Sequence, residues 1–176
     1  GVVGGAVDRS WMQYSLEQYD GYDPGIVIPE SITNNKASAT VDLPFNNTAT
    51  NSPIVYAPQL LGFAVGRLFN LRSGTTYRLA EICMIAVYAL LMYCAVMALP
   101  KWRIPVGLLL CVPQMLRLAS FSISADSLTQ AVMILFSCLL FRGIIGKRSQ
   151  RGAVALAVTS VLLAMCKFVY MPLVLL

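Results

Sequence analysis

The chain has 176 residues, of which 57% are hydrophobic and only 12% are charged, with a formal net charge of +5. Soluble domains carry roughly 25% charged residues, so this composition excludes an ordinary water-soluble domain and indicates a membrane protein. The positive charge does not indicate nucleic-acid binding, because the basic residues are scattered at the ends of predicted helices rather than clustered on one face.

Residues 1–52 are the most polar part of the chain and carry six acidic and two basic residues, a net charge of −4. Turn-forming residues are dense in 19–25, and 31–50 is rich in Asn, Ser and Thr. We therefore expect a water-exposed loop with one short helix near 11–18.

Residues 53–78 contain a short apolar stretch, Ile54 to Gly66, that ends at Arg67. It is shorter than the about 20 residues that a helix needs to cross a bilayer. The length favours a helix that lies in the membrane interface, with Pro53 in its first turn. In the alternative, 54–69 crosses the membrane and residues 1–52 move to the other side.

Residues 79–176 contain four longer apolar stretches, at 79–99, 104–120, 126–142 and from 152 onward. The first includes an uncharged run, Ile82 to Leu99, that is long enough as a helix to cross most of the roughly 30 Å hydrocarbon core. The predicted fold class is all-α transmembrane: a polytopic helix bundle of about four to five spans with a long extracytoplasmic loop. Because the chain starts without Met and stops inside an apolar run, we expect it to be an internal piece of a longer protein.

The basic residues predict the orientation of these spans. Four of them lie in one short connection: Arg142, Lys147, Arg148 and Arg151. Lys101 and Arg103 lie in another. Because Lys and Arg concentrate in short cytoplasmic loops, we predict a multi-pass protein of the cell membrane with loop 142–151 cytoplasmic and residues 1–78 extracytoplasmic.

Four charged residues then fall near the predicted outer face. At about 1.5 Å per residue, Arg117 lies roughly 20 Å into its stretch and Lys167 roughly 22 Å into the last one. Arg78 and Asp126 open helices from that same face. Charges in a bilayer are costly and usually face a bundle interior or a wet cavity. We predict one polar site, in which Arg78, Arg117 and Lys167 bind a lipid phosphate and Asp126 supplies a carboxylate.

A simpler alternative exists for each of these residues. Long basic side chains near helix ends reach to the lipid headgroups, and Asp126 follows Ser124 in a good helix N-terminus.

No dedicated metal centre is predicted. The sequence has no histidine, and its five cysteines lie in apolar stretches without metal or redox spacing. The carboxylate of the polar site can act as a general base or hold a divalent metal ion, which is the one cofactor left open.

Several short segments follow one another in an order that resembles a known family. They are Phe45–Gln59, Gly66-Arg67, Tyr77–Leu79, Pro113–Met115, Ala119–Asp126 and Lys167–Pro172. Together they resemble the bacterial membrane proteins grouped as domain of unknown function 2142. That family is similar to the GT-C class of polytopic glycosyltransferases, which move a sugar from a polyprenyl-phosphate carrier to an acceptor outside the cytoplasm.

The resemblance implies a GT-C-like bundle and a glycosyltransferase-like role in cell-envelope polysaccharide synthesis, with a polyprenyl-phosphate-linked sugar as donor. The class carries its catalytic acid early in the first outer loop, and no acidic pair with a nearby His is present here. The catalytic acid is therefore expected upstream of Gly1, and the catalytic residues stay unknown.

Two other functions are open: an envelope lipid transporter or flippase, and a non-catalytic membrane scaffold. Transporters tend to have internal repeats and midplane sites. The chain shows no repeat, and its charges gather towards one face, which favours the enzyme.

Overall fold

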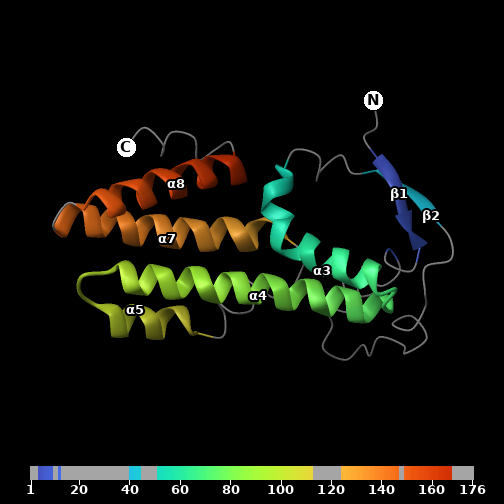
Figure 1. The fold of residues 1–176 in the computed structure, drawn as a ribbon, viewed down its shortest axis with the longest axis horizontal. Coiled ribbons are helices and arrows are strands. Elements are labelled where there is room, and N and C mark those ends of the chain that lie inside the picture. Colours follow the sequence, from blue (N-terminus) through green and yellow to red (C-terminus); the bar gives the residue numbers. More distant parts are fainter. Residues whose placement is uncertain are drawn as a thin grey trace. The chain divides into compact units, whose positions relative to one another are not determined.

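The computed structural model describes residues 4–9, 12, 40–44, 51–112, 124–146 and 149–167. In chain order the elements are β1 (Gly4–Asp8), β2 (Thr40–Pro44), the 3-10 helix η1 (Pro53–Tyr56), α3 (Ala57–Leu68), α4 (Ser73–Ala98), α5 (Arg103–Leu110), α7 (Ala125–Ile145) and α8 (Gln150–Cys166) (Figure 1). The chain divides into two compact units: Gly1–Thr50 with Gln59–Ala80, and Asn51–Pro58 with Glu81–Leu176.

In the first unit, β1 and β2 form an antiparallel pair, with Gly4 opposite Pro44 and Asp8 opposite Thr40. The sequence predicted no strands in residues 1–52, and the placement of these residues outside the membrane stays a prediction. The strand at 40–44 alternates polar and apolar residues, which is the period of a half-buried strand, but five residues are a weak signal among many turn formers. The helix expected near 11–18 lies outside the described residues apart from Met12.

The short helical region predicted after residue 52 is present as η1 and the 12-residue α3. Ser52 is the N-cap, and its hydroxyl accepts a hydrogen bond from the Ile54 N–H. Pro53 occupies the first turn, where its missing N–H costs nothing. Apolar side chains of α3, including Leu61 and Leu68, are exposed. The position of this helix in a membrane interface stays a prediction.

Helix α3 crosses the start of α4 at backbone contact distance. A Cβ added at Gly62 would lie 2.4 Å from the Ala80 Cα, and one added at Gly66 would lie 2.3 Å from the Thr76 Cγ2. Glycines four residues apart share one helix face, and their missing side chains allow two backbones to approach closely. The close crossing therefore depends on glycine at both positions.

Helix α4 has 26 residues and begins at Ser73, six residues before the predicted span. Helix α7 has 21 residues, and both helices are long and apolar enough to cross a membrane. Helix α8 is apolar but shorter, with 17 residues. Helix α5 ends at Leu110 and so covers only the first part of the predicted 104–120 stretch, of which residues 113–120 lie outside the described residues.

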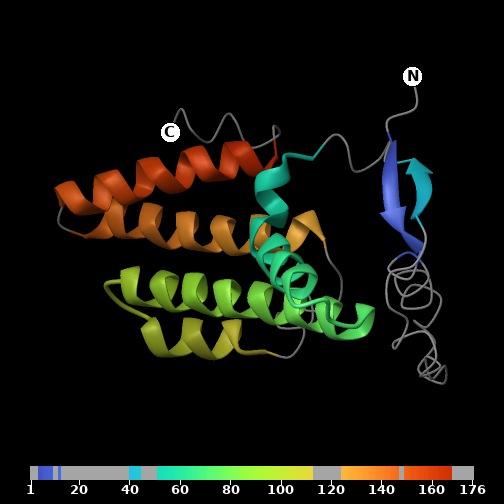
Figure 2. The same cartoon turned by 45° about the vertical axis from the view of Figure 1, so that its right-hand side comes forward.

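In the second unit the helices pack in the row α5, α4, α7, α8 (Figures 1 and 2). Tyr88 of α4 and Ala131 of α7 belong to one buried cluster, which also contains Leu110 of α5. Phe136 of α7 and Leu163 of α8 belong to another. Helix α7 is therefore the central element between α4 and α8.

Much of the apolar surface of these helices faces outward. Only 28% of the most apolar window of α4 and 33% of that of α7 is buried. The core helix of a soluble protein is mostly buried, whereas a membrane helix keeps apolar side chains towards lipid. Large apolar side chains with a high exposed fraction include Ile82, Ile104, Leu108 and Ile144.

The glycine crossing gives a stability prediction. We expect Gly62→Ala to lower the free energy of unfolding by about 1–3 kcal/mol, because the added methyl meets the α4 backbone. Gly143→Ala is the matched control on α7, since a Cβ there has no heavy atom within 4 Å, and better helix propensity should raise stability by about 0.5–1 kcal/mol. Thermal unfolding in detergent measures both, and equal effects of the two variants would contradict the crossing.

Candidate functional site

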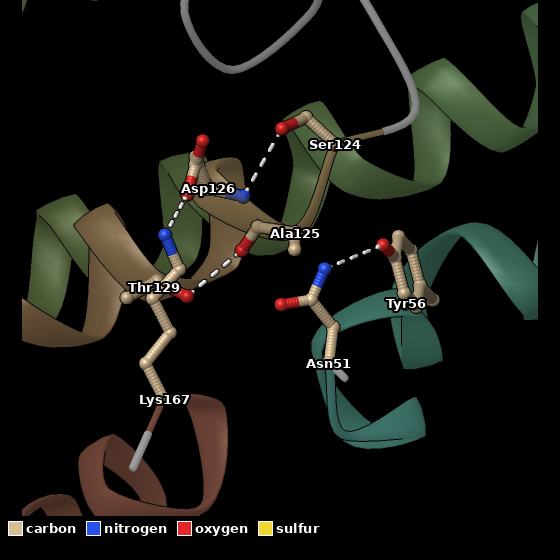
Figure 3. A network of polar contacts seen from close by, with 7 residues as sticks. All are labelled: Asn51, Tyr56, Ser124, Ala125, Asp126, Thr129 and Lys167. Carbon is tan, nitrogen blue, oxygen red and sulfur yellow. Dashed lines mark hydrogen bonds and ion pairs between the residues drawn. The ribbon is translucent and has the colours of Figure 1, made fainter. Parts of the chain in front are cut away.

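A polar cluster lies at one end of the second unit, where α7 begins and α8 ends (Figure 3). The Lys167 Nζ is 2.5 Å from the Asp126 Oδ1, which makes an ion pair between residues 41 positions apart in the chain. The Asp126 side chain is 72% exposed and that of Lys167 is 36% exposed. The pair is therefore open to an approaching ligand.

The start of α7 places the carboxylate. Ser124 is the N-cap, and its hydroxyl accepts a hydrogen bond at 3.1 Å from the Asp126 N–H. An acidic side chain in the first turn is also favoured by the partial positive charge of the helix N-terminus. The role of Asp126 at the helix start is therefore compatible with its pairing to Lys167, because the hydroxyl of Ser124 caps its backbone N–H while its carboxylate contacts the ammonium.

The end of α8 places the ammonium. The sequence predicts Lys167 inside an apolar span, but α8 ends at Cys166 and Lys167 is an extended C-cap residue. Its backbone N–H still donates to the Leu163 carbonyl, at 3.2 Å. A cation at a helix C-terminus is favoured by the partial negative charge there. The side chain therefore leaves the end of a helix instead of the middle of one, and residues 168–176 lie outside the described residues.

Two more polar residues that the sequence did not predict, Asn51 just before η1 and Tyr56 at its end, lie beside the cluster (Figure 3). Val55 of η1 is fully buried against Ala125 and Cys166, and this packing fixes η1 beside the ends of α7 and α8. The Asn51 Nδ2 donates to the Tyr56 hydroxyl at 3.4 Å (Figure 3). The one available signal was that both residues lie in the Phe45–Gln59 segment of the family resemblance.

Two of the four predicted site residues are in contact in the structure. Asp126 and Lys167 form the pair, whereas Arg78 is an exposed residue of α4 in the first unit. Arg117 lies outside the described residues. Within the ranges that the structure describes, no three His, Cys, Asp or Glu side chains are grouped to hold a metal ion.

The pair has a definite chemical capacity. A lysine ammonium carries three donors and a carboxylate carries two acceptor oxygens, and the contact between them uses the Oδ1 of Asp126. The second carboxylate oxygen points away from Lys167 (Figure 3). A fixed ammonium suits a phosphate, and an exposed carboxylate suits a hydroxyl donor or a cation.

The comparison with known families decides the class of the protein. Residues 28–176 match the family model described as "Predicted membrane protein (DUF2142)". The chain belongs to this family. The DUF2142 match spans α4, α7 and α8, so their outward-facing apolar residues are those of a membrane protein. No curated protein and no solved structure matches the chain.

A double-mutant cycle tests the ion pair of this DUF2142 chain. We expect Asp126→Asn, Lys167→Met and the double variant to give a coupling of about 0.2–1 kcal/mol in thermal unfolding, because both groups are partly exposed to solvent. Higher salt should reduce that coupling. Strict additivity of the two single variants at low salt would show that the pair does not form.

Proposed function

We propose that this chain is part of a multi-pass, GT-C-like glycosyltransferase that uses a polyprenyl-phosphate-linked sugar in cell-envelope polysaccharide synthesis. The observation that supports the proposal most is the Asp126–Lys167 pair at the end of the α7–α8 helix pair. It gives a membrane protein an exposed ammonium, held by a carboxylate, that a lipid phosphate can contact.

The proposed chemistry is the displacement of a lipid phosphate from a sugar. The departing phosphate gains negative charge, which fixed cations stabilise more strongly than mobile water does. Lys167 is the described group we assign to this role, and Asp126 holds its ammonium in place. Arg78 and Arg117 are proposed as further cations. The acceptor hydroxyl attacks the anomeric carbon of the sugar as the bond to the lipid phosphate breaks, and it gives its proton to a carboxylate base whose identity is unknown.

The position of the pair favours the enzyme over a transporter. Transporter sites lie near the bilayer midplane, often where helices are broken. Asp126 is in the first turn of α7 and Lys167 caps α8, so the pair lies at helix ends. We propose that this end faces the outside of the cell and that the loop at 142–151, 16 residues and about 24 Å further along α7, is cytoplasmic.

An assay of the full-length protein in liposomes with polyprenyl-phosphate sugars tests this function. We expect Lys167→Met to lower kcat by about 100-fold or more, by analogy with the loss of one fixed donor to a developing anion. Lys167→Arg should keep part of the activity because it retains the charge. Lys101→Met is the control, since Lys101 is an exposed cation that follows the C-terminal end of α4 and is not part of the Asp126–Lys167 pair. Wild-type turnover in Lys167→Met would reject the proposed site, and sugar-independent lipid flipping would favour the transporter.

Cysteine labelling tests the orientation. In a cysteine-free background, we expect Asp42→Cys to react with a membrane-impermeant maleimide on intact cells, and Ser149→Cys to react only after permeabilisation. Both positions are exposed, so the side of the membrane decides the result. Labelling of Ser149→Cys from outside would reverse the orientation.

A further inference from the structure

An apolar groove with a volume of about 880 Å³ lies within the second unit and is lined by residues of α4, α7 and α8. Its volume lies in the range of roughly 300–1,000 Å³ that is typical of small-molecule sites. Helix α7 lies between α4 and α8 (Figures 1 and 2), and residues of all three helices line the groove. The apolar walls include Met97 of α4, Leu135 and Leu139 of α7, and Val154, Val158 and Leu162 of α8.

Positive charge is confined to one end of this groove. Arg142, in the last turn of α7, and Arg151, in the first turn of α8, both line it and are exposed. No Asp or Glu is among the described lining residues. Among the residues that the structure describes, neither guanidinium has an ion-pair partner. A ligand that fits must be apolar along most of its length and anionic at one end.

The length of the groove identifies the apolar part of that ligand. From Arg151 to Leu162 it follows α8 for 11 residues, or about 17 Å at 1.5 Å per residue. One leaflet of a bilayer is about half of the roughly 30 Å hydrocarbon core. An acyl chain of one leaflet therefore fits along the groove while its headgroup stays level with the two arginines.

We propose that this groove binds one anionic glycerophospholipid, with its phosphate on Arg142 and Arg151 and an acyl chain against α4, α7 and α8. Arginine binds phosphate through paired, charge-assisted hydrogen bonds, and basic pockets between membrane helices bind anionic headgroups. The lipid stabilises the bundle, because it binds the folded helices and not the separated ones. A helix packed in the groove instead would leave two arginines without an anion.

This site is separate from the proposed glycosyltransferase site. Arg142 is 16 residues along α7 from Asp126, which is about 24 Å of helix. The proposal therefore does not rest on any catalytic activity, and its test needs none.

Native mass spectrometry of the delipidated full-length protein tests the proposal. Phosphatidylglycerol and phosphatidylcholine with identical acyl chains are titrated in parallel. We expect phosphatidylglycerol to bind at least about tenfold more tightly, and Arg142→Gln/Arg151→Gln to lose this preference, since charge-assisted hydrogen bonds to the phosphate are removed. Lys101→Gln removes an exposed charge that does not line the groove and should keep the preference.

A second pair of variants tests the apolar part. Val158 and Val161 are both on α8 and are 53% and 51% exposed, but only Val158 lines the groove. We expect Val158→Trp to fill the groove and abolish lipid binding and the lipid-dependent rise in Tm, and Val161→Trp to leave both unchanged. If Val158→Trp does not fold, the arginine variants decide the question.

Three outcomes would overturn the proposal. They are equal binding of the two lipids, undiminished preference in the double arginine variant, and equal loss of binding in both tryptophan variants. A dimer that persists without lipid and that Val158→Trp dissociates would instead assign the groove to a second copy of the chain.

Discussion

A helix with apolar side chains on its outer surface must form the hydrogen bonds of its backbone and hydroxyl groups within the helix. This constraint underlies the structure of the second unit. An unpaired polar group in an apolar medium costs several kcal/mol, roughly 2–7 depending on the reference. The hydroxyls of Thr129, Ser137 and Ser160 each donate to the carbonyl four residues earlier, at 2.7–2.9 Å. These three hydroxyls thus pair within their own helices, whereas the buried hydroxyl of Tyr88 in α4 has no hydrogen-bond partner among the described residues.

Four ionised side chains of the second unit lie at helix ends, because a charge is costly to bury in an apolar medium. At one end of the second unit, Asp126 and Lys167 neutralise each other. At the other end, Arg142 and Arg151 lie beside an apolar groove without an acidic partner among the described residues. The two ends therefore differ in what they can bind: the first offers a charge pair of both signs, and the second offers only positive charge.

Close packing in the first unit follows a different rule. Residues with a small side chain or none allow two helix backbones to approach to contact distance. Gly62 and Gly66 meet Ala80 and Thr76 in this way. The T-shaped contact between the Phe63 and Tyr77 rings, with centroids 6.2 Å apart, lies on the same pair of helices.

The sequence predicted α4, α7 and α8 well, because long runs of apolar residues with few or no charges are typical of membrane helices. The predicted stretch starts at residue 79, six residues after α4 begins, because the charged Arg78 marks its edge in the sequence, whereas the helix continues through that residue. It missed β1 and β2, because residues that pair across the chain leave little local signal. Asn51 and Tyr56 were missed as site neighbours because only the packing of η1 brings them there.

The sequence by itself determined that this is a helical membrane protein and that Asp126 and Lys167 are candidates for a polar site, since composition and the length of apolar runs can be read directly from the sequence. Only the tertiary structure decided that these two charges meet, that Lys167 is the C-cap of α8, and that Arg142 and Arg151 share a groove. Contacts between residues 41 positions apart depend on how helices pack, and packing is a property of all the helices together.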